Sequence, residues 1–295
     1  MSGVIKFRLC WVLTRKILES LHLQICRCCS MYKRHPLFFL FMFFLSIQVG
    51  HAQVVRIGVK AGPRMSWMKM DDTFFKDTVR IQPTLNYTVG AVASFKVKDR
   101  YFLHTELNYT TKGKITKGKI DPLLEDRVTY RYLDVPALFS MQFKGKLKSE
   151  RQFKWYLGVG PNVSYWLGGN GVIKSSDLYE NNIDKLKYSI KFGTRPNADN
   201  PDEMYVEGAR RLQFGIVAAG GVMFEPAGGN KFMIDLRYEG GHSQLGTKGD
   251  FLIPTDYDDN LRARNRGLTL SVIYLLEYNL NPDVRNRGKS TIKRR

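Results

Sequence analysis

Apolar and polar side chains alternate with a period of two in eight separate segments of this chain. Such alternation is the pattern of β-strands whose two faces meet different surroundings. In each segment one face is apolar, while the other carries mainly glycine, hydroxyl or charged residues. The segments cover residues 55–61, 87–97, 103–109, 133–143, 155–165, 212–224, 232–238 and 268–278. Eight two-faced strands predict an all-β protein, built either as a closed barrel or as a sandwich.

Short and long connections alternate between these segments. The short ones are 98–100, 144–152 and 226–230, and the long ones are 69–82, 112–127, 167–210 and 243–264. This alternation is typical of an outer-membrane barrel, in which short turns face the periplasm and long loops face the outside. An even number of strands then places both chain ends in the periplasm.

Aromatic side chains gather at both ends of the segments. Near the short turns they are Phe95, Tyr101, Phe143, Phe153, Trp155, Phe224, Phe232 and Tyr278, and near the long loops Tyr87, Tyr109, Tyr130, Tyr132, Tyr165, Trp166 and Tyr238. We interpret the two groups as the aromatic girdles of a membrane barrel. A soluble sandwich or lipocalin-like barrel also alternates, but it would carry charges outside. The sequence therefore predicts an eight-stranded antiparallel up-and-down transmembrane β-barrel.

Two prolines fall inside the predicted strands, Pro136 in 133–143 and Pro161 in 155–165. A proline in mid-strand removes one hydrogen-bond donor from the ladder. We therefore expect a bulge or a strand end at each of them.

Export is indicated by the 22 residues that start at Met31. A basic start at Lys33 and Arg34 is followed by an apolar stretch from 37 to 49 and by small residues before Gln53, which together are typical of a signal peptide. The apolar stretch is too short for a membrane-spanning helix of roughly 20 residues. We leave open whether translation starts at Met1 or at Met31.

These features divide the chain into four parts. Residues 1–30 are expected to be an upstream extension without a structural role, and 31–52 the signal peptide. Residues 53–280 would form the outer-membrane barrel, and 281–295 a basic periplasmic tail. Location in the outer membrane follows from this division.

Charge adds a weaker constraint. The chain has 46 basic and 27 acidic residues, and residues 1–52 account for 7 and 1 of them, so the exported part carries 39 against 26, or +13. An exported basic protein meets anionic lipid, lipopolysaccharide or peptidoglycan rather than nucleic acid. For the basic tail, solvation without a partner is the simpler interpretation.

Eight ionisable side chains on the polar face would point into the lumen. They are Arg56, Lys60, His104, Glu106, Asp134, Asp235, Arg237 and Glu239. The lumen of an eight-stranded barrel is filled by side chains, so we expect it not to conduct. Buried charges must pair, because an unpaired one costs several kcal/mol. We interpret the set as a structural ion network, with a substrate or proton path as the alternative.

No catalytic, cofactor or metal site is indicated. His104 and Glu106 share a strand face and could orient a serine nucleophile, but no serine has a nucleophile signature. The cysteine cluster 26–29 precedes the signal and lacks a partner histidine at zinc spacing. The acidic loop 256–259 lacks the spacing of a calcium loop. We expect no enzymatic activity, no cofactor and no metal.

Several short motifs resemble those of the PorT-like outer-membrane β-barrels of Bacteroidetes-type bacteria. The resemblance covers residues 55–278, and its carriers are Ile57–Gly62, Glu106–Tyr109 with Lys112-Gly113, Tyr132–Pro136, Gly158–Asn162 and Gly267-Leu268. The stretches Tyr165–Gly169 and Asp235–Glu239 look similar to the secretion-linked branch of that family.

The resemblance implies an accessory role in type IX protein secretion, with which the founding member is associated, although many relatives have no assigned role. Expected partners are outer-membrane lipid, lipopolysaccharide and proteins of the secretion machinery. The alternative is a surface receptor in which the loop 167–209, rich in Asn, Asp and Lys, binds an external ligand or lipopolysaccharide. No functional residue is carried over from the family.

Overall fold

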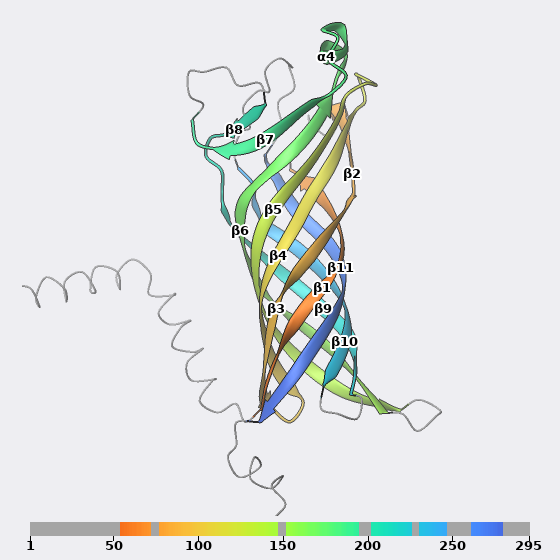
Figure 1. Ribbon diagram of the computed structural model, residues 1–295, viewed down its shortest axis with the longest axis vertical. Coiled ribbons are helices and arrows are strands. Elements are labelled where there is room, and N and C mark those ends of the chain that lie inside the picture. The colour runs from red at the N-terminus through yellow and green to blue at the C-terminus, as the bar shows by residue number, and fades with distance from the viewer. Residues whose placement is uncertain are drawn as a thin grey trace, which may run out of the picture. The chain divides into compact units, whose positions relative to one another are not determined.

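The computed structural model describes residues 54–71, 77–146, 152–194, 202–225, 230–246 and 261–279. Eight of its strands form a closed ring (Figure 1). In ring order they are β1 (Val54–Met70), β3 (Thr84–Lys98), β4 (Tyr101–Gly118), β5 (Glu125–Lys146), β6 (Gln152–Lys174), β9 (Leu212–Phe224), β10 (Lys231–Gln244) and β11 (Ala263–Asn279). The upstream extension, the signal peptide and the basic tail expected from the sequence lie outside the described residues.

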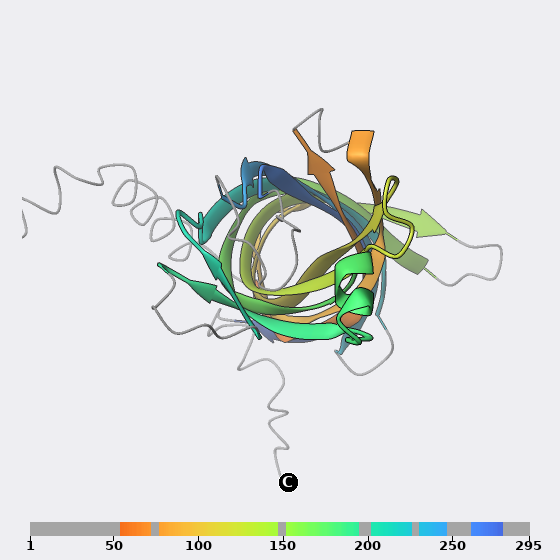
Figure 2. The same ribbon diagram turned by 90° about the horizontal axis from the view of Figure 1, so that it is seen from above.

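The ring closes because the first strand pairs with the last. The antiparallel β1–β11 ladder runs from Val54 opposite Asn279 to Met70 opposite Ala263. Every other neighbouring pair in the ring is also antiparallel, and the view along the barrel axis shows the closed circle (Figure 2). The predicted eight-stranded antiparallel up-and-down barrel is confirmed. Among the described residues, no helix is both long and apolar enough to cross a membrane.

The barrel is apolar on its outside. Val59, Leu157 and Leu236 point outward and are 62%, 57% and 49% exposed. Their strand neighbours point inward and are largely polar, as with buried Lys60 beside Val59. On β6 the apolar outer band extends from Trp155 to Tyr165, which matches the roughly 9–11 residues that a tilted strand needs to cross a bilayer. This arrangement suits a surrounding of hydrocarbon.

The strands continue beyond this band at the end with the long connections. β4 and β5 reach Gly118 and Glu125, so only a short turn joins them. Beyond β6 follow α4 (Ser176–Glu180), β7 (Leu186–Phe192), which is antiparallel to β6, and β8 (Glu203–Val206), which is parallel to β7. A short strand, β2 (Val79–Gln82), pairs with the end of β4. We call these parts together the external extension.

The expectation of open loops at 112–127 and 167–210 was therefore wrong. Outside the membrane the outer face no longer needs to be apolar, and on β5 it carries exposed Arg127 and Arg131. The backbone ladder continues all the same, with Arg127 paired to Ile115 of β4. The contrast between the two faces is reversed there, with polar residues outside, and the strand does not end.

Three aromatic residues assigned to the outer girdle lie inside instead. Tyr130, Tyr132 and Trp166 have no exposed surface. The Trp166 ring stacks on Tyr132 at 6.3 Å and meets Tyr130 edge-on at 5.3 Å. They belong to the apolar core that fills the external extension, together with residues such as Ile173 and Leu178. Every second residue of a strand points inward, and these three residues occupy such positions. The girdle assignment did not take this alternation into account.

The two prolines also differ from expectation. The β4–β5 ladder passes from Thr105 opposite Ala137 to Asn108 opposite Asp134 without a register shift, so the strand continues through Pro136. The β5–β6 ladder passes Pro161 in the same way. Neither proline marks a bulge or a strand end. Each is accommodated by the loss of ladder pairs beside it.

Candidate functional site

All eight lumen side chains selected from the sequence are buried in the barrel, with exposed fractions of 0–7%. The residues are Arg56, Lys60, His104, Glu106, Asp134, Asp235, Arg237 and Glu239. They come from β1, β4, β5 and β10, and they all follow the inward parity of these strands. The structure does not bring them into one network. They form two ionic clusters, a separate histidine contact and a group at the mouth of the barrel.

The Arg237 cluster consists of Arg237, Glu106, Asp235 and Lys60. The guanidinium donates two hydrogen bonds to the Glu106 carboxylate, at 2.6 and 2.7 Å, and its Nε donates to Asp235 Oδ2 at 2.5 Å. Lys60 Nζ lies 3.5 Å from Glu106 and 3.8 Å from Asp235. Two cations thus face two carboxylates, so the formal charges cancel. Such balance is what a lumen without bulk water requires.

The Lys112 cluster lies next to it, toward the external extension. Lys112 Nζ is 2.7 Å from Glu239 Oε1 and 3.1 Å from Asp134 Oδ1, and it also donates to Ser164 Oγ at 3.1 Å. Arg64 Nη2 contacts the other Glu239 oxygen at 2.8 Å. This cluster again has two cations and two carboxylates.

Arg64 and Lys112 were missed by the sequence reasoning. Arg64 has the same inward parity as Lys60 on β1, but it follows Pro63, where the apolar alternation breaks. Lys112 has the parity of Glu106 on β4, but it lay in a segment assigned to a loop. Parity counted past the end of the apolar band would have found both residues.

His104 takes no part in the ion pairs. Its Nε2 lies 2.6 Å from Ser140 Oγ, and its ring lies between Phe102 and Tyr156 at 6.3 and 5.9 Å. Ser140 in turn donates to the carbonyl oxygen of Phe102 at 3.3 Å. The Ser140 hydroxyl is therefore shared between the His104 ring and a backbone carbonyl oxygen. The Glu106 carboxylate binds Arg237, so it does not orient His104 as the acid of a catalytic triad does.

The two ionic clusters leave little free space between them. The cavity that both clusters line has a volume of about 30 Å³. This is room for two or three water molecules, since each needs about 10–15 Å³ by this measure. Toward the short turns, buried apolar residues including Leu138, Met223 and Met233 also fill the lumen. The interior is therefore packed rather than open.

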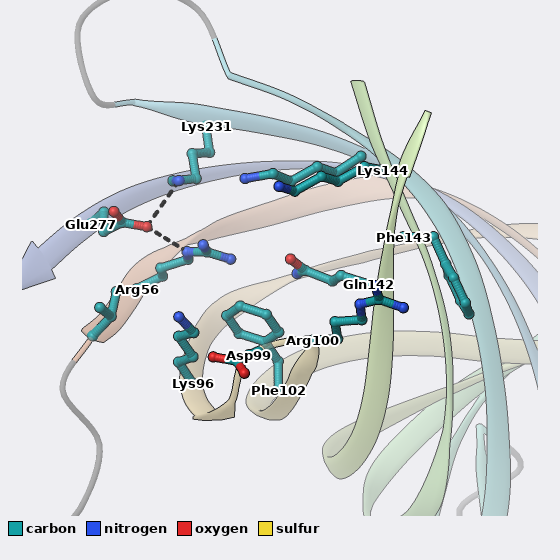
Figure 3. Close-up of a pocket in the computed structure, with 12 residues that line it drawn as sticks. Arg56, Lys96, Asp99, Arg100, Phe102, Gln142, Phe143, Lys144, Lys231 and Glu277 are labelled. Atoms are coloured by element: carbon teal, nitrogen blue, oxygen red, sulfur yellow. Dashed lines mark hydrogen bonds and ion pairs between the residues drawn. The ribbon is translucent and has the colours of Figure 1, made fainter. Parts of the chain in front are cut away.

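A larger cavity lies where the barrel ends at its short turns. This mouth pocket has a volume of about 630 Å³ and is lined by Arg56, Gln142 and Glu277, among others (Figure 3). Arg56 Nε donates to Glu277 Oε2 at 2.7 Å, and Lys231 binds the same oxygen at 2.9 Å. Arg56 therefore belongs to the mouth and not to the inner clusters.

At the mouth, Glu225 follows the end of β9 and bridges two lysines. Its carboxylate lies 2.7 Å from Lys154 Nζ and 2.7 Å from Lys231 Nζ. Burial acts to raise the pKa of Glu225, but the hydrogen bonds and charges of the two lysines outweigh it and lower the pKa to about 2. Glu225 is thus ionised at any physiological pH, and it links Lys154 of β6 to Lys231 of β10 at the short-turn end of the barrel.

Within the described parts of the chain, no group of three or more His, Cys, Asp or Glu side chains is placed to hold a metal ion. The cysteine cluster and the acidic loop 256–259 lie outside the described residues, so their interpretation stays a prediction.

Comparison with protein families gives a match over most of the barrel. The family model described as "Outer membrane protein beta-barrel domain" matches residues 51–244, which is more than half of the chain. A comparison with curated proteins gave no match.

Several solved structures are similar. OprG of Pseudomonas aeruginosa is 10% identical with a TM-score of 0.45, and the match covers 78% of this chain and 98% of that one. Neisserial surface protein A is 11% identical with a TM-score of 0.35, covering 75% and 97%. The outer membrane protease OmpT of Escherichia coli is 6% identical with a TM-score of 0.32, covering 78% and 98%.

Proposed function

Because the chain belongs to the outer membrane protein β-barrel domain family, we propose that it is a non-conducting, non-enzymatic barrel of the outer membrane that acts through the surfaces at its two ends. The observation that carries this proposal is the packed lumen, where two charge-balanced clusters leave a cavity of only about 30 Å³. A barrel filled in this way anchors its ends in the membrane but gives solutes no path.

Conductance of the purified protein in planar lipid bilayers tests this proposal. We expect no discrete current steps. The charge-balanced double variant Lys112→Ala/Glu239→Ala removes one cation and one carboxylate, and it should give measurable leak because two long side chains leave the lumen. Stable current steps from the wild-type protein would refute a closed barrel.

The absence of enzymatic activity rests on the surroundings of Ser140 and His104. Both side chains are buried, at 1% and 4% exposure, and the Phe102 carbonyl oxygen competes with His104 for the Ser140 hydroxyl proton. A nucleophile needs both access to substrate and a base that accepts its proton. Hydrolysis of a peptide or ester substrate that is lost in the His104→Ala variant would contradict the proposal.

For the finer role we propose an accessory function in type IX protein secretion. The support is the sequence resemblance at Tyr165–Gly169 and Asp235–Glu239 described above. Deletion of the gene should reduce the amount of type IX cargo in the culture medium and increase it in the periplasm. Complementation with the wild-type gene should restore both. Normal cargo secretion in the deletion strain would remove this role.

A second candidate function is the binding of an external ligand or lipopolysaccharide. It is favoured because the external extension is packed around a buried core of its own. Its core buries Tyr130, Trp166 and Leu178. Asp121 in the β4–β5 turn fastens the start of α4, since Ser176 Oγ donates to it at 2.6 Å and Ser176 N at 3.1 Å. A packed extension presents a fixed surface, whereas a solvated loop does not.

Replacement of residues 175–209 by a short turn separates the two functions. Cargo secretion should be unchanged in both cases. If the protein is a surface receptor, the wild type should bind lipopolysaccharide and the replacement should abolish this binding. If it is a secretion accessory that works at its periplasmic end, neither protein should bind lipopolysaccharide. A matched control replaces residues 119–120 and 122–124 by Gly and Ser and leaves Asp121 in place. If this control loses binding to the same extent, the 175–209 segment is not the binding surface.

A further inference from the structure

The mouth pocket carries an excess of positive charge that the fold does not neutralise. Its lining contains six cationic side chains, namely those of Arg56, Lys96, Arg100, Lys144, Lys154 and Lys231, but only two acidic ones, Asp99 and Glu277. None of the ion pairs between described residues involves Lys96, Arg100 or Lys144. The inner clusters differ, because their charges cancel. The mouth therefore favours an anion.

Two buried donors in this pocket have no partner. Arg56 is 5% and Gln142 is 7% exposed. Arg56 Nη1 and Gln142 Nε2 are both inaccessible to solvent, and neither donates a hydrogen bond to any described residue. Figure 3 shows the Arg56 guanidinium and the Gln142 amide pointing toward one another across the cavity. A buried donor without an acceptor is costly, and a bound anion in the pocket would supply the acceptor that both donors lack.

The guanidinium is already held in position. Glu277 accepts from Arg56 Nε at 2.7 Å, and the cation lies 4.5 Å from the centre of the Phe102 ring. These contacts fix the plane of the guanidinium and leave Nη1 for a further acceptor. The chain's own tail is a poor occupant, because residues 281–295 contain six basic residues and one acidic residue.

The size and charge of the pocket narrow the class of ligand. A volume of about 630 Å³ is in the range of small-molecule sites, roughly 300–1,000 Å³. Phe102 and Phe143 add apolar surface beside the cations. Glu225 at the edge of the pocket pairs with Lys154 and Lys231, so six cations face three carboxylates. The remaining excess of three positive charges favours a group with more than one negative charge. A phosphomonoester carries about −1.5 to −2 at neutral pH, whereas a carboxylate carries one.

We propose that the mouth pocket binds a phosphate group, either free or as a phosphomonoester on a small organic body, with Arg56 Nη1 and Gln142 Nε2 as its buried donors. This site lies at the short-turn end, which faces the periplasm in outer-membrane barrels. It does not depend on either of the functions proposed above.

Isothermal titration of the detergent-solubilised protein tests the proposal, with inorganic phosphate, glycerol 3-phosphate and glycerol as probes at constant ionic strength. Both phosphates should bind, and glycerol should not. Tighter binding of glycerol 3-phosphate identifies the organic ester as the source, and equal binding identifies the free anion. No binding of either phosphate would overturn the proposal.

Variants separate a built site from general attraction to a basic surface. Gln142→Leu keeps the size of the side chain and removes the unpartnered donor, so it should fold normally and weaken phosphate binding at least tenfold. Arg56→Gln should do the same. Lys98→Gln is the matched control, because Lys98 is an exposed cation at the same end that does not line the pocket. Equal weakening by Lys98→Gln and Gln142→Leu would refute the site.

Discussion

At the scale of single residues, Arg237 determines whether the lumen charges balance. Its replacement by leucine leaves Lys60 alone against the carboxylates of Glu106 and Asp235. Removal of one partner from a buried ion pair costs about 3–5 kcal/mol. We expect Arg237→Leu to lower the free energy of unfolding by about this amount, as measured by urea titration of the protein in lipid vesicles.

A charge-balanced double variant is the control for this prediction. Arg237→Met combined with Glu106→Gln leaves one cation, Lys60, and one carboxylate, Asp235. Replacement of a buried pair by neutral groups is often close to neutral in stability. The double variant should therefore recover most of the loss. If it is as unstable as Arg237→Leu, packing and not charge explains the effect.

Glu225 gives a prediction about pH. Its pKa is lowered from an ordinary value of 4.5 to about 2, so its contribution to stability is complete above pH 4.5 and is lost as the pH falls toward 2. The stability difference between wild type and Glu225→Gln should be constant between pH 5 and 7 and should shrink between pH 4.5 and 2. Chemical unfolding at a series of pH values measures this. A difference that grows on acidification would contradict the assigned direction.

Parity along a strand was enough to predict that eight charged residues point inward, since it depends only on local geometry, and it missed Arg64 and Lys112 only because it was not counted past the apolar band. It could not identify their partners. Arg56 pairs with Glu277, 221 positions away, and this contact depends on the register in which β11 closes on β1. The mouth pocket was missed for the same reason, because its walls come from several strands and the register between those strands cannot be read from the sequence.

At the scale of one element, the ladder between β5 and β6 shifts its register where β6 leaves the membrane. Leu167 is an extra residue between Trp166 opposite Tyr132 and Gly168 opposite Arg131, which is a β-bulge. Gly168 has φ +148°, and a Cβ there would lie 3.8 Å or more from its neighbours. The backbone conformation, and not space, requires the glycine.

Gly168→Ala should therefore destabilise the protein by about 1–3 kcal/mol through backbone strain alone. Gly240 is the matched control, because a Cβ there also meets nothing closer than 3.6 Å and its φ is not positive. Gly240→Ala should change the stability by less than about 0.5 kcal/mol. Equal effects of the two substitutions, measured by urea unfolding, would argue against strain at the bulge.

The strand centres were predictable from sequence, but their outer ends were not. Inside the membrane one face must be apolar, and this gives the period-two signal. In the external extension both the exposed Arg131 and its buried neighbour Tyr130 lie on a regular strand. Their alternation has the opposite sense, apolar inside and polar outside, as in a soluble sheet. The change of sense marks where the membrane ends, and it explains why Tyr130 was assigned to the wrong face.

At the scale of the whole molecule, the outer face of one continuous sheet meets hydrocarbon along the apolar band and water beyond it. Leu236 lies at the centre of the apolar band on β10 and is 49% exposed, and Leu123 lies in the β4–β5 turn and is 54% exposed. Arginine on the lipid face near the bilayer midplane costs about 2–4 kcal/mol, but it costs little in water. Leu236→Arg should lose this amount in vesicle unfolding, whereas Leu123→Arg should match the wild type. If both variants unfold alike, hydrocarbon does not surround the band, and the assignment of the outer face would fail for the entire barrel.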